Sequence, residues 1–159
     1  MAKFKTHPTM IKFPKNFTYN HFIKMPILKA LLAWLVSLAL PAIETSQEVF
    51  KGITLFLLGF ATLLTPQLAI DSAVILSWHS NWIFFFALFA FYKKKYGQSF
   101  YLSLAGAILA LSILFFPTVP LGPEFEKIHY KCRIGVYIWT LSMMYLALVS
   151  NKKNKKRGL

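Results

Sequence analysis

The sequence predicts an all-α membrane protein with four transmembrane helices and one short helical segment that re-enters or lies on the membrane surface. Two observations predict this class. Of the 159 residues, 57% are hydrophobic and 14% are charged, about half the charged share of a soluble domain. A globule of this size has no interior for so much apolar surface. The cations also gather at the ends of apolar runs, as in integral membrane proteins.

The N-terminal part of the chain predicts a surface arm followed by a first membrane span. Residues 1–25 are rich in lysine and aromatic side chains, and Pro8 and Pro14 interrupt any helical period, so we expect an irregular cytoplasmic arm. Residues 26–43, "PILKALLAWLVSLALPAI", carry a single charge at Lys29. Their 18 residues of helix extend about 27 Å, and the Lys29 amine can reach back to the interface.

The next apolar run, "ITLFLLGFATLL" at 53–64, has only 12 residues. A helix of this length is about 18 Å long, which is short for a membrane crossing. Runs of this length are more often interfacial or re-entrant. We therefore expect a re-entrant or interfacial helix at 53–64.

Three further runs have the length of spans. The segment 73–92 carries polar side chains in its first half and ends at a triple lysine. The segment 100–116 contains Gly106, alanines and serines, which allow a neighbouring helix to approach closely. The last span is predicted at 134–149, followed by the basic cytoplasmic tail 150–159. Residues 117–131, between the last two spans, contain three prolines, and we expect them to form a loop. The bundle as a whole then covers residues 26–149.

The distribution of cations decides between four crossings and five. If 53–64 does not cross, the N-terminal arm, the triple lysine and the tail share one side, with 14 of the 18 basic residues and none of the five acids. If it crosses, the basic residues divide nine and nine. The positive-inside rule favours four crossings with both termini cytoplasmic. Lys93, Lys94 and Lys95 are then a cytoplasmic anchor attracted by anionic lipid, at about 1 kcal/mol per residue, and no nucleic-acid partner is expected.

Candidate interaction residues lie on the predicted outer side, around the polar cluster "SWHSN" at 77–81. The candidates are Asp71, Trp78, His79, Asn81, Trp82 and His129. His79 could ligate a metal or shuttle a proton with Asp71 orienting its ring, but two histidines without fixed spacing do not predict a metal site. In a purely structural interpretation, Trp78 and Trp82 form an aromatic belt, and His79 and Asn81 bond backbone groups where the short run folds back.

No pattern in the sequence predicts catalysis, a cofactor or a metal. A phosphate-binding glycine loop, a nucleophile elbow and paired carboxylates are all missing. The spans at 100–116 and 134–149 contain no charged residue or histidine, whereas transporters usually carry one at that depth. Cys132 is the sole cysteine, and its neighbours Lys131 and Arg133 would lower the pKa of its thiol.

The chain resembles a group of small, mostly uncharacterised bacterial inner-membrane proteins. The resemblance rests on the N-terminal anchor, the short apolar run from Gly52 to Gly59, the Trp78 to Asn81 segment, and a last span carrying Gly135, Tyr137 and Trp139. It implies an architecture and no activity. In topology and charge the chain is also similar to the immunity proteins of pore-forming bacteriocins, which bind a toxin's membrane domain.

These observations predict a non-catalytic membrane protein that acts as an accessory or interaction subunit. It would contact a protein partner in the membrane through helix packing and its outer face. The alternative is an immunity-type protein that binds the membrane domain of a toxin.

Overall fold

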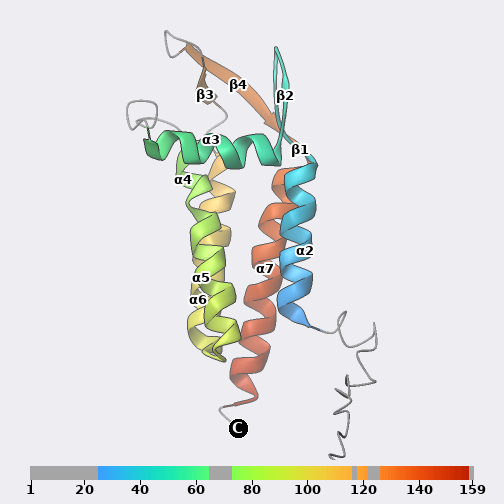
Figure 1. Ribbon diagram of the computed structural model, residues 1–159, viewed down its shortest axis with the longest axis vertical. Helices are drawn as coiled ribbons and strands as arrows, with labels where there is room; N and C mark the ends of the chain where they lie inside the picture. The colour runs from blue at the N-terminus through green and yellow to red at the C-terminus, as the bar shows by residue number, and fades with distance from the viewer. Residues whose placement is uncertain (1–24, 65–72, 116–117, 122–125, 158–159) are drawn as a thin grey trace, which may run out of the picture.

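The computed structural model describes residues 25–64, 73–115, 118–121 and 126–157. Its long helices run side by side in one bundle (Figure 1). α7 packs against both α2 and α6, and α5 packs against α6. The direction alternates along the chain, so that α2 begins and α7 ends at the same end of the bundle. These helices are α2 (Pro26–Ala39), α5 (Ser80–Tyr92), α6 (Tyr96–Leu111) and α7 (Ile134–Lys155).

A short helix and a small sheet cover the opposite end of the bundle. The short apolar run forms α3 (Gly52–Leu64), which confirms the predicted helix, and α3 lies crosswise over the helix ends (Figure 1). Beyond it stands an antiparallel sheet with the strand order β2-β1-β4-β3. The strands are β1 (Pro41–Thr45), β2 (Val49–Lys51), β3 (Thr118–Leu121) and β4 (Glu126–Cys132). The protein is mostly helical, but the prediction of an exclusively helical fold is wrong.

Local sequence explains both hairpins of this sheet. In the first, the Thr45 amide donates to the Glu48 carbonyl oxygen at 2.8 Å, and the Thr45 hydroxyl oxygen accepts from the Glu48 amide at 3.0 Å, which closes a tight turn. In β4, "EKIHYKC" alternates apolar and polar side chains, as expected for a half-buried strand. Accordingly, Tyr130 is buried and His129 is exposed. The predicted loop before the last helix is therefore largely a β-hairpin.

Two of the predicted spans are not continuous helices over their predicted length. α2 ends at Ala39 instead of continuing to residue 43, because Pro41 has no N–H to donate and disfavours helical geometry at Leu40. The predicted span at 73–92 is divided into α4 (Ala73–Trp78) and α5 by a turn at His79.

The last two helices are longer than predicted. α6 starts at Tyr96 and continues into the 3₁₀ turn η2 (Ser112–Leu114). α7 extends to Lys155, so most of the predicted tail is helical. Lysines in this last turn suit the negative end of the helix dipole. By length and composition, Tyr96–Leu114 and Ile134–Lys155 are both able to cross a membrane, whereas Pro26–Ala39 is a shorter apolar helix.

The bundle buries small polar side chains and exposes large apolar ones, the reverse of a soluble protein. Its core contains Trp34, Phe84, Phe91, Met143 and Leu146 together with alanines. Hydroxyl groups are buried between the helices, including those of Ser80, Ser99, Ser103, Thr140 and Ser150. The outside is apolar, with Phe86, Phe89, Tyr101, Ile108 and Leu148 each at least 60% exposed.

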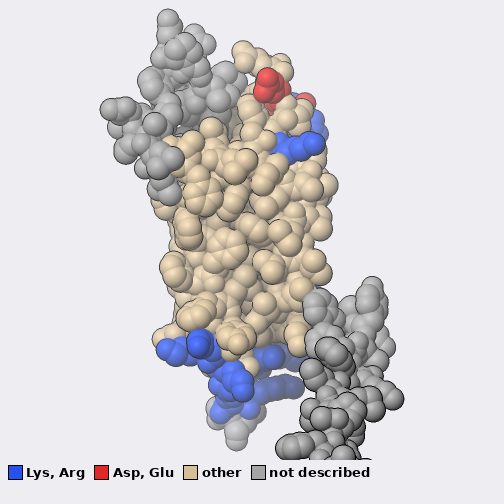
Figure 2. All heavy atoms as spheres, viewed as in Figure 1, with Lys and Arg blue, Asp and Glu red and all other residues tan. Residues whose placement is uncertain are grey.

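Among the residues that the structure describes, charged side chains are confined to the two ends of the bundle. On the face shown in Figure 2, an uncharged belt separates a basic end from an end that carries acids and a few cations. The end with acids and cations includes an ion pair between Glu44 on β1 and Arg133, which immediately precedes α7. The basic end is formed by the α5–α6 turn and the last turn of α7.

Candidate functional site

Two glycines allow α3 to lie directly on the bundle. A Cβ atom at Gly52 would overlap the Ser37 carbonyl oxygen of α2, and one at Gly59 would overlap the indole ring of Trp78. At the start of α7, a Cβ at Gly135 would come within 2.7 Å of the Pro41 carbonyl oxygen. Since real side chains do not approach so closely, the absence of a side chain at these positions sets the spacing between α3, α2 and the sheet.

Trp78 fastens α3 to the bundle. It is the last residue of α4 and is 3% exposed. Its indole Nε1 donates to the Phe56 carbonyl oxygen in α3 at 2.9 Å. Its ring also meets Phe60 of α3 edge to face, with 5.1 Å between the centroids. The Trp78 side chain therefore holds α3 in two ways, by a hydrogen bond to a backbone carbonyl and by aromatic packing.

Beneath α3, the side chain of Asn81 joins three helices. Its Oδ1 accepts one hydrogen bond from the indole of Trp34 on α2 and a second from the indole of Trp139 on α7, each at 2.9 Å. Its Nδ2 donates to the Trp78 carbonyl oxygen, also at 2.9 Å. Both lone pairs of the amide oxygen are thus used. Because the amide is buried, these bonds fix the relative positions of α2, α5 and α7.

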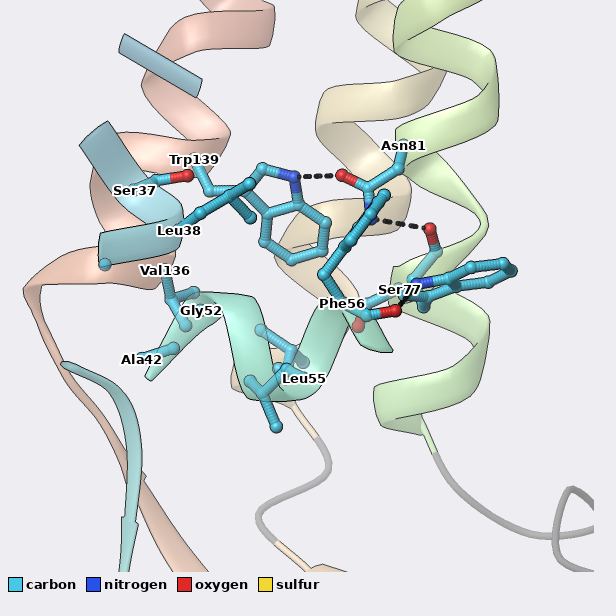
Figure 3. Close-up of a pocket in the computed structure, with 13 residues that line it drawn as sticks. Ser37, Leu38, Ala42, Gly52, Leu55, Phe56, Ser77, Asn81, Val136 and Trp139 are labelled. Atoms are coloured by element: carbon cyan, nitrogen blue, oxygen red, sulfur yellow. Dashed lines mark hydrogen bonds between the residues drawn. The ribbon is translucent and has the colours of Figure 1, made fainter. Parts of the chain in front are cut away.

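A pocket lies between α3 and this network (Figure 3). It has a volume of about 40 Å³ and is lined by residues that include Ser37, Phe56, Ser77, Asn81 and Trp139. A space of this size suits a few water molecules or one small group. None of the described lining residues carries a carboxylate, imidazole, thiol or amine. The lining can therefore hold a neutral molecule by hydrogen bonds and apolar contact, and supplies no group that titrates near neutral pH.

The structure separates the predicted interaction residues into two sets. Trp78 and Asn81 are buried and serve the internal network, so their side chains do not contribute to the outer surface. His79, at the α4–α5 turn, and Trp82 are exposed. His129 is exposed on β4, opposite Thr118 of β3. Asp71 lies outside the described residues. Of the purely structural interpretation, Asn81 does bond a backbone group, the Trp78 carbonyl oxygen. Trp78 is buried and does not form an exposed aromatic belt with Trp82.

Sequence reasoning missed the pairing of Trp34 and Trp139 with Asn81. The position of both tryptophans could have indicated the pairing. Tryptophan usually lies at the membrane interface, whereas Trp34 and Trp139 fall inside apolar runs. A buried indole N–H requires an acceptor, and Asn81 is a polar residue within a predicted span whose amide oxygen can accept two hydrogen bonds.

The neighbourhood of Cys132 also differs from the prediction. Burial, and not the flanking cations, dominates, and it raises the pKa of the Cys132 thiol. Burial likewise raises the pKa of the Tyr130 phenol, whose hydroxyl donates to the Ile113 carbonyl oxygen at 2.7 Å. At neutral pH the thiol is mostly protonated, which suits a structural residue better than a nucleophile.

Comparison with known proteins adds no further constraint on this site. No protein-family model, no curated protein and no solved structure matches the chain. The function is therefore argued from the geometry and the charge distribution of the molecule.

Proposed function

We propose that the chain is a multi-pass protein of a bacterial inner membrane, crossing at α2, α4–α5, α6 and α7. The observation that carries this proposal is the uncharged belt between an end that carries only cations and an end that carries both acids and cations (Figure 2). Lysine-rich ends stay in the cytoplasm. The basic end, where α2 begins and α7 ends, is then cytoplasmic, and the sheet and α3 are outside.

The lengths of the helices agree with this arrangement. Tyr96–Leu114 contains 19 residues, which corresponds to about 28 Å of helix. α2, with 14 residues, extends only about 21 Å, but Lys29 near its start is exposed and can reach the headgroups. Extended residues of β1 continue from its other end. The short first helix is therefore compatible with a crossing.

We further propose that the molecule acts without catalysis, as an accessory subunit that binds a protein partner through its outer end. One side of α3 is fixed to the bundle by Gly52, Gly59 and Trp78. The other side is apolar and exposed, through Ile53, Leu57 and Leu58. An apolar face held at the bundle end is a common form of membrane-protein interface. A partner that packs on α3 would bury it.

Site-specific photo-crosslinking in native membranes tests this interaction. A photo-reactive amino acid at Leu57 should give one discrete protein adduct. The matched control is Leu148, which is similarly exposed on the belt of α7 and should give lipid adducts only. If Leu57 also gives lipid adducts only, α3 lies in lipid and the partner surface is wrong.

The same topology supports a second candidate, an immunity-type protein that binds the membrane domain of a pore-forming toxin. The supporting observation is the up-and-down bundle in which α2 begins and α7 ends on the basic side. Deletion of the gene should then cause sensitivity to one bacteriocin with no other envelope defect. An unchanged bacteriocin response together with a stable complex at α3 would exclude this candidate and favour the accessory subunit.

A further inference from the structure

Two basic segments lie together at the end of the bundle opposite the sheet. One is the α5–α6 turn with Lys93, Lys94 and Lys95, and the other is the last turn of α7 (Figure 2). The cations of the second segment are Lys152, Lys153, Lys155, Lys156 and Arg157. The acids of the described chain, Glu44, Glu48 and Glu126, all belong to the sheet region. Within the described residues, these cations therefore have no carboxylate nearby.

Specific contacts fasten the end of α7 to the turn. Arg157 Nη1 donates to the Lys94 carbonyl oxygen at 2.7 Å, and the Arg157 guanidinium lies 4.6 Å from the centroid of the Tyr96 ring. The Lys153 amine lies 5.1 Å from the Phe91 centroid and 5.5 Å from that of Tyr96. Lys153 and Arg157 thus hold the two segments together by cation–π contacts.

The turn itself has a defined backbone. Lys94 has a φ of 60°, a left-handed conformation that a non-glycine residue adopts mainly in a fixed tight turn. Its carbonyl oxygen is the acceptor for Arg157. The remaining cations are exposed and extend from these two fixed backbone segments: Lys93, Lys94, Lys95, Lys152, Lys155 and Lys156.

The positive charges of these lysines repel one another, and an anion bound between them would offset this repulsion. We propose that the α5–α6 turn and the last turn of α7 form a binding site for the phosphate of an anionic phospholipid headgroup. The proposal rests on the membrane location proposed above. It goes beyond general attraction to the leaflet, because it assigns one headgroup to a site of fixed geometry.

The depth of the site favours a lipid over a soluble anion. Tyr92 ends α5 and Tyr96 begins α6, so two tyrosines flank the three lysines. Tyrosine is enriched at the headgroup level of membranes. The apolar belt ends at the same place, and lipid phosphates are concentrated at this depth. Lysine amines bind such phosphates as point charges.

Lipid titration of the purified full-length protein in a neutral detergent tests the proposal. Phosphatidylglycerol should raise the unfolding temperature saturably, whereas phosphatidylcholine and soluble glycerol phosphate should not. Lys95→Gln/Lys152→Gln, with one charge removed from each segment, should weaken phosphatidylglycerol binding by about tenfold or more. The matched control is Lys51→Gln/Lys131→Gln at the sheet end, with expected binding like the wild type. An equal loss in both pairs would overturn the site.

A third variant separates a built site from diffuse attraction. Tyr96→Leu keeps every charge but removes the ring that both Lys153 and Arg157 contact. Binding should weaken several-fold, and unchanged binding would contradict the proposal, as would equally tight binding of glycerol phosphate. Alkaline carbonate extraction checks the membrane location separately. Protein that resists extraction but shows no preference for phosphatidylglycerol overturns the lipid site alone.

Discussion

The amide oxygen of Asn81 accepts the indole N–H of Trp34 across 47 residues of sequence, at 2.9 Å. The indole of Trp139 occupies the second lone pair of the same oxygen. Replacing Asn81 by an apolar residue removes the acceptor of both indoles, of which Trp34 is buried and Trp139 is half-buried beside the pocket. Asn81 therefore helps to fix the position of α2 against α5 and α7.

Asn81→Leu keeps nearly the same volume and should lower the free energy of unfolding by about 1–3 kcal/mol, because two indole N–H groups lose their acceptor. Trp34→Phe removes only one donor and should cost less. The free energy of unfolding in detergent micelles measures both effects. Asn151→Leu, the same replacement at a half-buried position near the end of α7, is the control and should be near neutral. Equal stability of Asn81→Leu and wild type would show that the network does not hold the bundle.

Gly52→Ala should destabilise the protein, by about 1–3 kcal/mol, because the added methyl group meets the backbone oxygen of Ser37 and no rotamer relieves the overlap. Gly97→Ala is the matched control in α6, where the nearest atom to an added Cβ is an Asn154 amide oxygen at 3.5 Å. That substitution should be neutral or stabilising, since alanine favours helix by up to about 1 kcal/mol. Thermal unfolding of the two variants distinguishes them by sign. The same sign for both would contradict the close contact between α3 and α2.

Cys132 should react slowly with a membrane-impermeant maleimide at pH 7, because its thiol is half-buried and partial burial raises the pKa of the thiol. In a Cys132→Ser background, Ser46→Cys places a thiol in the exposed β1–β2 turn and should label much faster. The rates are measured on intact spheroplasts. Labelling of Ser46→Cys only after lysis would place the sheet in the cytoplasm, and equal rates for the two thiols would contradict the burial of Cys132.

Stability should fall at alkaline pH. The pKa values of Cys132 and Tyr130 are raised in the fold, so their contribution is fully present below the ordinary thiol value of 9.0 and is lost as pH rises through the raised values. Unfolding temperatures measured from pH 7 to 11 detect the loss. Cys132→Ser/Tyr130→Phe should show a smaller decline over this range than the wild type. An identical decline in both proteins would show that other groups cause it.

The helical segments and the charged ends were predictable because their signals are local. Uninterrupted apolar runs and terminal lysines are visible without any knowledge of pairing, and α3 was recognisable from its own 12 residues. The positions of the helix ends were predicted less accurately. The stop at Ala39 required giving Pro41 more weight than the apolar residues around it.

The sheet and the Asn81 network depend on contacts between distant parts of the chain. β1 pairs with β4, with Ile43 opposite Cys132. Neither segment is long enough to be predicted as a strand from its own sequence. The alternation of apolar and polar residues in β4 was visible in the sequence, but the prolines that precede it favoured a loop. Trp34, Asn81 and Trp139 come from three helices, and only the packing of those helices shows that one amide serves both indoles.

We propose that the chain crosses a membrane four times with both ends on the cytoplasmic side. A reporter that is active only after export, placed at three positions, tests this topology. We expect activity for an insertion after Gln47, in the β1–β2 turn, and none for an insertion after Lys94 or a fusion after Leu159. Activity from the Leu159 fusion, or silence at Gln47 in a stably expressed protein, would contradict it.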